Sequence, residues 1–565
     1  MRRIINWLRE FFFPGEGASI WRRMLPYAVL GLLTVLVLVG ATMTWEYTNS
    51  NTFCGNLCHT MPPQYSTYLR SAHAGVDCVE CHLGRAPLPT QIIRKAQDGT
   101  LTFTSLISES YEFPLRAHNM RPANEACETC HYPAKFSLDS FKDIVHYDTD
   151  RNNTASTTYL ILKTGGGTQR EGLGYGIHWH IENEVQFYSS DEDQQDIPYV
   201  RVMNADGTYT EYIDLESDID PDQILEEDLH SMDCITCHNR TSHLVEQPYV
   251  AVEQLMQRGL ISADIPYIRV NAVQALQAGY KSKADALAGI ATLDDYYAAE
   301  YPAIYPAGNS EMQQVVDELL TTYEESVFPE QGLNWDSHPN NIGHDDFPGC
   351  FRCHDGRHFN AEAEAVRLEC NICHSIPVVA GTEDFVADIQ IDRGPEPDNH
   401  RNPNWISIHR EVLNPTCETC HTTGDPGGVS NTSFCSNSAC HGSAWTFAGF
   451  DAPSLRETLS DQIKAMIPET PLVSPDAEAT YATLQPVFEA KCGGCHGEDG
   501  MHGLTVIHYE DLLAGGASGP AVRPGDVEGS LIIKVLNGPT PHFAQLTTDE
   551  MNLLIEWIRN GAPED

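Results

Sequence analysis

The feature that most constrains this chain is a cysteine motif that occurs nine times. All 18 cysteines fall in pairs, and a histidine directly follows the second cysteine of every pair. Two thiols and an adjacent imidazole are what covalent haem c attachment needs, because the thiols bond the two vinyl groups and the histidine binds the iron. The sequence therefore predicts nine covalently bound haems c. The motifs, in chain order, are Cys54/Cys58/His59, Cys78/Cys81/His82, Cys127/Cys130/His131, Cys234/Cys237/His238, Cys350/Cys353/His354, Cys370/Cys373/His374, Cys417/Cys420/His421, Cys435/Cys440/His441 and Cys492/Cys495/His496.

Zinc sites and disulfides are the alternatives for a cysteine-rich chain. Zinc sites would not place a histidine directly after every second cysteine, and disulfide frameworks have no use for that histidine. Two motifs depart from the usual two-residue spacing: Cys54 and Cys58 enclose three residues, and Cys435 and Cys440 enclose four. We expect the extra residues to loop out, so that both motifs still attach haem.

The charge balance excludes one class of partner. The chain has 34 basic and 79 acidic side chains and a net charge of −45. Such a chain is repelled by phosphate backbones, so we expect no nucleic-acid partner. A solvated acidic surface is the ordinary interpretation, and docking to a basic redox partner is the alternative.

One segment is apolar enough to cross a membrane. Residues 24–45 carry no charged side chain, and as a helix they would span about 33 Å, enough for a bilayer core. Arg22 and Arg23 precede this segment and Glu46 follows it. The positive-inside rule therefore predicts a single-pass anchor of the cytoplasmic (inner) membrane, with the N-terminus inside and the haem domains on the periplasmic or extracytoplasmic side. A cleaved signal peptide is the alternative, although the apolar run exceeds a normal signal core.

The motif spacing suggests how the chain is divided. Strand-like runs at 158–162, 184–188 and 199–202 predict a small β insertion, and residues 247–330 contain neither cysteine nor histidine but show helical patterning. We expect a mainly α and irregular multihaem cytochrome c, with one N-terminal transmembrane helix, a small β insertion and an all-α C-terminal domain. The expected parts are a cytoplasmic segment (1–23), an anchor (24–45), a first tetrahaem domain (46–245) with its β insertion (about 140–225), a helical spacer (246–335), a second tetrahaem module (336–455) and a monohaem domain (470–565).

The C-terminal segment resembles a class I monohaem cytochrome c domain. The matching stretches are Pro486-x-Phe488 before the motif at Cys492, then Pro524-Gly525-Asp526, then Ile555-x-Trp557-Ile558 ahead of Gly561. Such domains usually supply a methionine just before the closing helix. Here His542 occupies that neighbourhood, which implies bis-histidine ligation and a lower reduction potential; Met501 and His502 are the alternatives.

The chain also has enough histidines to supply sixth ligands. It contains 24, of which nine lie in the motifs. That surplus is what bis-histidine haem ligation requires. The pairings do not follow from the sequence, and in His178-Trp179-His180 one of the two imidazoles is open to a structural role. The candidate distal ligands near a motif in sequence are His73, His118, His178, His180, His230, His344, His358, His400 and His409.

The N-terminal region carries a family pattern. After the anchor come Cys58-His59-Thr60-Met61, Ser71-Ala72-His73 before the motif at Cys78, and Lys95-Ala96-Gln97-Asp98. Residues 20–240 thereby resemble the NapC/NirT/NrfH family of membrane-anchored tetrahaem quinol dehydrogenases. The resemblance implies a first haem at the membrane surface that takes electrons from menaquinol. It also implies that Met61 replaces His59 on that iron, that His73 is a distal ligand and that Asp98 accepts a proton. The longer spacing of the first motif leaves the choice between His59 and Met61 open.

A longer resemblance reaches residue 376. It rests on Asp233 to His243, on Asn341-Ile342-Gly343-His344, and on Phe347 to Gly356. These stretches look like the larger inner-membrane NapC/NirT-type cytochromes of bacteria that respire on metals or external acceptors.

Together these observations predict an electron conduit. Electrons from the menaquinol pool would reach periplasmic or extracellular acceptors in anaerobic respiration, through a periplasmic or membrane redox protein, with quinol dehydrogenase activity at the anchor end. The alternative is a multihaem reductase of a small substrate such as nitrite, which needs a five-coordinate haem. A filament of stacked cytochromes is a third class, and a retained anchor argues against it.

Overall fold

The computed structural model places the chain in two compact units. The first unit comprises residues 1–131, 240–251 and 273–338, and the second comprises residues 132–239, 252–272 and 339–565. The residues that the structure describes are 2–15, 17–57, 60–108, 110, 112–117, 120–132, 138–165, 176–381, 402–412, 421–466, 473–474, 477–497, 503–537 and 546–565.

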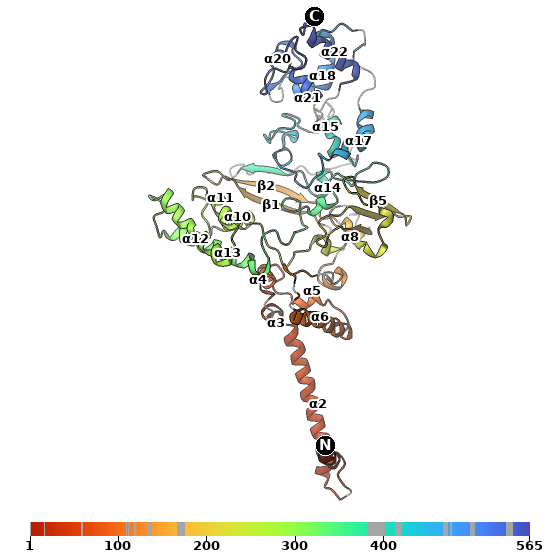
Figure 1. The fold of residues 1–565 in the computed structure, drawn as a ribbon, viewed down its shortest axis with the longest axis vertical. Helices are drawn as coiled ribbons and strands as arrows, with labels where there is room; N and C mark the ends of the chain where they lie inside the picture. The colour runs from red at the N-terminus through yellow and green to blue at the C-terminus, as the bar shows by residue number, and fades with distance from the viewer. Residues whose placement is uncertain are drawn as a thin grey trace. The chain divides into compact units, whose positions relative to one another are not determined.

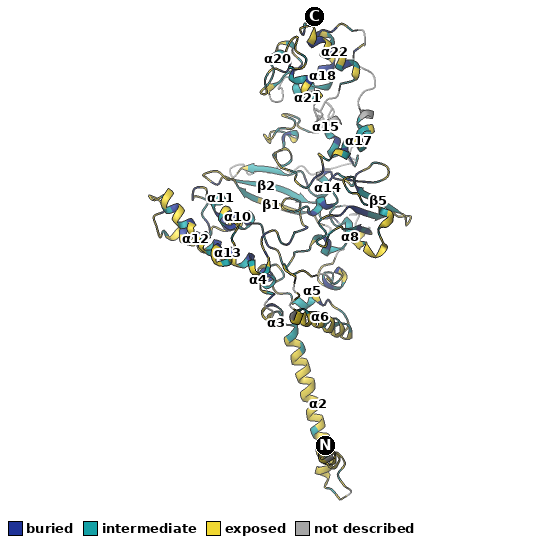
Figure 2. Cartoon of the chain, viewed as in Figure 1, coloured by how far each residue is buried: buried dark blue, intermediate teal, exposed yellow. Residues whose placement is uncertain are grey.

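The first unit begins with the apolar helix that the sequence predicts. Helix α1 (Arg2–Phe12) precedes α2 (Ile20–Asn49), which is exposed along almost its whole length (Figure 2). The hydroxyls of Thr34, Thr42 and Thr44 donate to backbone carbonyls one turn earlier, so these polar groups are satisfied within the helix. Among the described helices, α2 alone is long and apolar enough to cross a membrane.

The first haem motifs lie among several helices of the first unit. Helix α3 (Asn51–Asn56) holds Cys54 and α5 (Cys78–His82) holds the second motif, while α7 (Ala123–Ala126) ends just before Cys127; α4 (Pro62–Arg70) and the longer α6 (Leu88–Ser108) lie between them in sequence. The Asn51 side chain ties α3, which holds Cys54, to its neighbours, because it accepts a hydrogen bond from the Cys78 backbone amide at 2.8 Å and donates to the Tyr68 hydroxyl of α4 at 2.8 Å.

The remainder of the first unit is helical scaffold. Helices α12 (Lys283–Glu300) and α13 (Ser310–Ser326) pack against each other, and the hydroxyl of Ser66 in α4 donates to the Glu325 carbonyl of α13 at 3.0 Å. Helices α10 (Pro248–Gln257) and α11 (Ile268–Gln277) lie in the same stretch of sequence, and the division into units falls within each of them. These helices lie within 246–335, and the division of the chain into a separate helical spacer there stays a prediction.

The second unit contains two antiparallel sheets (Figure 1). One has the order β1-β2-β8 and the other has the order β6-β3-β4-β5-β7. The predicted strand runs are present as β2, β3 and β4, but β7 and β8 come from the later haem region. The β insertion is therefore completed by strands from outside 140–225. The strands are β1 (Ser140–Tyr147), β2 (Ala155–Leu162), β3 (Val185–Tyr188), β4 (Tyr199–Met203), β5 (Tyr209–Asp214), β6 (His230–Ser231), β7 (His358–Phe359) and β8 (Val378–Gly381).

Several short helical turns in this unit coincide with haem motifs. Helix α8 (Trp179–Glu182) precedes β3, while α9 (Cys234–Cys237), α14 (Cys370–Cys373) and α16 (Ser438–His441) each hold motif residues. Helices α15 (Trp405–Val412) and α17 (Pro453–Met466) pack through buried Ile408, Leu455 and Leu459.

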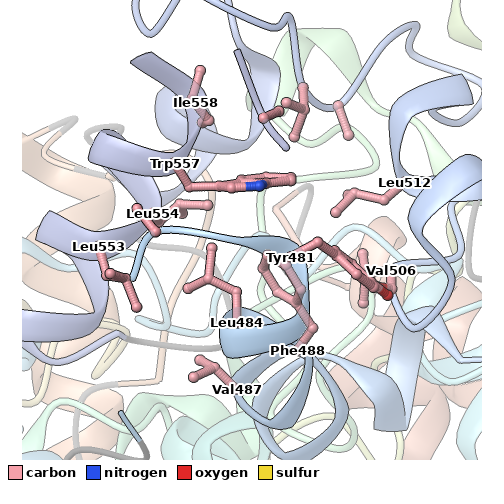
Figure 3. Packing of buried hydrophobic residues seen from close by; sticks show 14 of the residues in the cluster. Tyr481, Leu484, Val487, Phe488, Val506, Leu512, Leu553, Leu554, Trp557 and Ile558 are labelled. Atoms are coloured by element: carbon pink, nitrogen blue, oxygen red, sulfur yellow. The ribbon is translucent and has the colours of Figure 1, made fainter. Parts of the chain in front are cut away.

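The C-terminal part has an all-α core, as the sequence predicts. Helices α18 (Tyr481–Lys491), α19 (Gly493–His496), α20 (Tyr509–Ala514), α21 (Leu531–Leu536) and α22 (Thr548–Arg559) follow one another. The Trp557 ring is fully buried among Tyr481, Leu484 and Phe488 (Figure 3), and its Nε1 donates to the Pro563 carbonyl at 2.8 Å. This apolar cluster makes the segment a core of its own.

The two compact units divide the haem motifs differently from the expected domains. The first three motifs lie in the unit that carries the anchor, and the fourth, at Cys234, lies in the second unit. The expected tetrahaem domain at 46–245 is thus divided after its third motif.

Candidate haem sites

Five motif histidines each face one other histidine. Every pair joins one proximal histidine to one histidine from outside the motifs, and both members lie in the same compact unit. The pairs, with the distances between ring centroids, are His82 and His243 (6.3 Å), His131 and His73 (6.0 Å), His238 and His178 (6.4 Å), His354 and His180 (5.6 Å), and His374 and His344 (6.4 Å).

These separations fit two imidazoles on opposite sides of one iron. With metal–nitrogen bonds of about 2 Å, the ring centroids of two axial imidazoles lie about 6 Å apart. Ordinary ring stacking or direct hydrogen bonding would not select one motif histidine for each pair. The residues present therefore fit haem c held by two histidines.

Hydrogen bonding fixes which ring nitrogen is available. A carbonyl oxygen only accepts, so a ring nitrogen bonded to it must carry the proton, and the other nitrogen keeps its lone pair. His243 Nδ1 donates to the Gln64 carbonyl at 3.0 Å, and His180 Nδ1 donates to the Ile177 carbonyl at 2.8 Å. On the proximal side, His354 Nδ1 donates to the Arg367 carbonyl at 2.5 Å. This orientation presents Nε2 to the paired ring, as iron ligation requires.

Burial keeps these imidazoles neutral. It is the main cause that lowers the pKa of His243 to about 4, followed by the neighbouring His82, and it likewise lowers the pKa of His354 to about 4, followed by His180. A neutral imidazole has the lone pair that a metal ion needs.

The structure differs from the sequence-based expectation at His358. Its Nδ1 bonds Asp355 Oδ1 at 2.9 Å and its Nε2 donates to the Ile197 carbonyl at 2.7 Å, so both ring nitrogens are engaged. Burial acts to lower the pKa of His358, but the hydrogen bond and charge of Asp355 raise it overall. The same cluster holds Arg357, which bonds both Asp355 and Asp214. We read His358 as part of a buried ion cluster rather than as a haem ligand.

Two other expectations change. His230 lies exposed on β6 against the ring of Phe187, with centroids 5.4 Å apart, and faces no motif histidine that the structure describes. Both His178 and His180 face a proximal histidine, so both stay candidate distal ligands. His243 was not among the distal ligands predicted from the sequence, although it follows the fourth motif by only a few residues.

The seventh motif is described only at its histidine. The ring of His421 is stacked on that of Phe434, with centroids 4.1 Å apart and planes inclined by 20°, a contact that the sequence did not predict. Stacking engages the face of an imidazole, whereas iron binds a nitrogen in the ring plane, so the contact is compatible with ligation. Cys417 and Cys420 lie outside the described residues, and haem attachment at His421 therefore stays a prediction.

The ninth motif is described in part as well. Cys495 lies on α19 between Cys492 and His496, but its side chain is outside the described part of the chain, as is that of Cys370 on α14. The Cys492 side chain is half-buried and packs against the apolar core of the C-terminal part. The helical turn has the spacing that haem c attachment needs, while the thioether at Cys495 stays a prediction.

The remaining candidates are placed less completely. His409 Nδ1 donates to the Ile406 carbonyl at 2.6 Å, which is the pattern of His180, and Met61 is half-buried just before α4. The proximal rings of His441 and His496 also donate through Nδ1, to the carbonyls of Gly428 and Leu504. Cys58, His59, His118, His400 and His542 lie outside the described residues, as do Met501 and His502.

The thiols show which attachment sites are neighbours. The hydrogen bond with Cys78, of the second motif, is the main cause that lowers the pKa of Cys54, of the first motif, to about 7. Burial, then Glu80, then Cys130 of the third motif raise the pKa of Cys81. The first three attachment sites therefore adjoin one another within the first unit.

The expected proton acceptor lies near the second motif. Asp98 Oδ2 pairs with Arg121 Nη2 at 3.3 Å, and Arg121 Nε donates to the His82 carbonyl at 3.1 Å. Its neighbour in sequence, Lys95, lies at the end of the anchor: Nζ donates to Thr48 Oγ1 at 2.7 Å and is 4.8 Å from the ring centroid of Trp45. Burial lowers the pKa of Lys95, and the Cys54 thiol acts against that shift.

Comparisons with known proteins place two segments of the chain in cytochrome c families. Residues 19–142 match the N-terminal region of the NapC/NirT cytochrome c family, and residues 492–541 match the family described as Planctomycete cytochrome C. No solved structure matches the chain.

Two curated relatives are cytochromes. The chain is 37% identical over 361 residues to the cytochrome c-type protein ImcH of Geobacter sulfurreducens, covering 63% of this chain and 71% of the relative. It is 32% identical over 117 residues to the cytochrome c-type protein NrfH of Wolinella succinogenes, covering 20% of this chain and 64% of the relative. The chain belongs to the NapC/NirT-type membrane multihaem cytochromes, which carry covalent haem c and transfer electrons.

Proposed function

We propose that this protein is a nonahaem cytochrome of the inner membrane that moves electrons from menaquinol to acceptors outside the cytoplasm. The observation that carries the proposal is the set of five histidine pairs, each built from one motif histidine and one histidine from outside the motifs. With all 18 cysteines in attachment motifs, the same chemistry extends to nine haems.

The chain's own residues favour electron transfer over substrate reduction. A bound haem c supplies one-electron redox chemistry. A haem iron held by two histidines would offer no free position to a small substrate such as nitrite. The five paired sites thus weigh against the reductase alternative.

Two charged residues of α6 support quinol oxidation near the anchor. Quinol releases protons as well as electrons, so a base must stand near the first haem site. Lys95 and Asp98 both lie on α6, and Lys95 contacts the end of the membrane helix. We assign Asp98, held by Arg121, as the candidate proton acceptor, and Lys95 as a cationic group that orients the quinol oxygen.

Orientation follows from charge. Arg22 and Arg23 lie in the first turn of α2, and the motifs follow its other end. By the positive-inside rule, α1 then lies on the cytoplasmic side and the haem motifs lie outside, where a periplasmic or membrane redox protein would collect the electrons.

The test uses the full-length protein in lipid vesicles. Mass determination is expected to show nine added haems, and a menaquinol analogue is expected to reduce them. Asp98→Asn is expected to slow quinol-driven reduction at least tenfold while leaving reduction by dithionite unchanged. Asp317→Asn, which changes an exposed carboxylate on α13, is the matched control and should behave as the parent protein.

Two results would overturn the proposal. One is a mass without haem. The other is a substantial high-spin fraction together with turnover of nitrite at rates above those of quinol-driven reduction.

A further inference from the structure

Arg352 lies between the two thiols of the fifth motif. It is only 7% exposed, and all of its described hydrogen bonds go to backbone carbonyls. Nε donates to Gly349 at 2.9 Å, Nη1 to Gln194 at 2.8 Å and Nη2 to Thr236 at 2.9 Å. Thr236 in turn lies between the two thiols of the fourth motif. One guanidinium therefore joins the attachment turns of two haem sites.

A second side chain supports this link. Asn341 Nδ2 also donates to the Thr236 carbonyl, at 2.9 Å, and its Oδ1 accepts a hydrogen bond from Gln195 Nε2 at 2.9 Å. Because Asn341 and Arg352 share one carbonyl acceptor, the position of the fourth attachment turn is fixed from two directions.

The distal side of the same two sites is joined as well. His178 faces His238 of the fourth motif, and His180 faces His354 of the fifth. The two distal histidines are separated by Trp179 alone, at the start of α8. The fourth and fifth sites are thus joined through their attachment turns and through the short, half-buried segment that carries His178 and His180.

No carboxylate in the described part of the chain forms an ion pair with Arg352. Two other arginines of the second unit differ: Arg357 pairs with Asp214 at 3.0 Å, and Arg201 pairs with Glu226 at 2.6 Å. A buried charge acts over longer distances than an exposed one, because little water screens it.

We propose that Arg352 couples the fourth and fifth haem sites into one pair and that its charge raises the reduction potentials of both. This inference rests on the proposed haem occupancy. Reduction adds one electron, and a nearby fixed positive charge stabilises the reduced state. In a chain whose net charge is −45, the buried positive charge thus favours electron uptake at the fourth and fifth haems.

The experiment is a spectroelectrochemical titration of the full-length protein in detergent, with Arg352→Met, Arg352→Lys and Arg201→Gln. In Arg352→Met, two of the nine haems are expected to lose at least tenfold in their equilibrium constant for reduction, about 59 mV for a one-electron couple. Arg352→Lys keeps the positive charge but not all three hydrogen bonds to backbone carbonyls, so the decrease in the equilibrium constant for reduction is expected to be smaller than in Arg352→Met. Arg201→Gln removes a paired charge and should leave the titration unchanged.

Asn341→Leu separates the link from the charge. It removes one hydrogen bond to Thr236 and no charge, so the potentials are expected to stay within about threefold of the parent, and it also serves if Arg352→Met fails to fold. Nine attached haems with an unmoved titration in the Arg352 variants would overturn the inference. So would a shift confined to one haem, or an equal shift in Arg201→Gln. Loss of haem from the parent protein would instead overturn the proposed function.

Discussion

Replacing His180 by alanine tests whether this histidine is a haem ligand or an ordinary buried side chain. His180 Nε2 lies 3.4 Å from His354 Nε2, and the ring pair is assigned to the fifth haem site. Without that imidazole, one of nine irons loses an axial ligand, so about one ninth of the haem, roughly 11%, is expected to become high-spin. The assay is electron paramagnetic resonance of the oxidised protein, with the high-spin ferric signal integrated against total haem.

His358→Ala is the matched control, since His358 lies in the same unit and is also buried. Its loss leaves the Ile197 carbonyl without this donor, while Asp355 keeps Arg357 Nε at 2.9 Å. Losing hydrogen bonds to a buried carbonyl and a carboxylate costs about 1–3 kcal/mol. The control is therefore expected to lower the midpoint of thermal unfolding but to leave the spin state unchanged.

The spin state should thus change in His180→Ala alone, whereas the larger decrease in the midpoint of thermal unfolding is expected in His358→Ala. His180→Ala loses one bond to the Ile177 carbonyl, worth about 1 kcal/mol, and changes the spectrum. A fully low-spin His180→Ala protein, or a high-spin signal in His358→Ala, would refute the pairing of the histidines.

Three further predictions concern contacts elsewhere in the chain. Glu253 raises the pKa of His146 through a hydrogen bond and its charge, so this pair stabilises the protein below about pH 6.5 and its contribution is lost as pH rises through the raised pKa. The difference in unfolding temperature between the parent protein and His146→Gln should therefore shrink from acid to alkaline pH, and a constant difference would contradict this. Lys491→Met leaves the fully buried Glu550 without the cation at 2.5 Å and should destabilise the C-terminal core by about 3–5 kcal/mol in denaturant titrations, whereas adding Glu550→Gln should recover part of the loss. A chain without residues 1–49 should appear in the soluble fraction after cell lysis; its retention in membranes would argue against α2 as the anchor.

The attachment sites could be predicted because each is a local pattern. The two thiols and the histidine lie within one helical turn, as in α5 and α9, so short-range spacing suffices to define the proximal side. The anchor is equally local, since twenty or so apolar residues in succession predict a membrane helix without any tertiary contact.

The distal ligands depend on contacts between distant parts of the chain. His243 lies close in sequence to the fourth motif but faces His82 of the second motif, 161 residues away, so nearness to a motif does not show which haem a histidine serves. It favoured His358, four residues after His354, where Asp355 and Ile197 engage the imidazole instead. The same limitation applies to β7 and β8, whose pairing partners β5 and β2 lie far away in sequence.

The distribution of positive charge explains why Arg352 stands apart from other arginines at the haem motifs. Arg94 donates to the Leu83 carbonyl and Arg121 to the His82 carbonyl, so both also support an attachment turn. However, Arg94 pairs with Glu125 at 2.7 Å and Arg121 pairs with Asp98, and each pairing largely cancels the field at the haem. The acidic surface, by contrast, is screened over about 8 Å at physiological ionic strength. Salt should therefore alter docking of a redox partner much more than the potentials of the two haems beside Arg352.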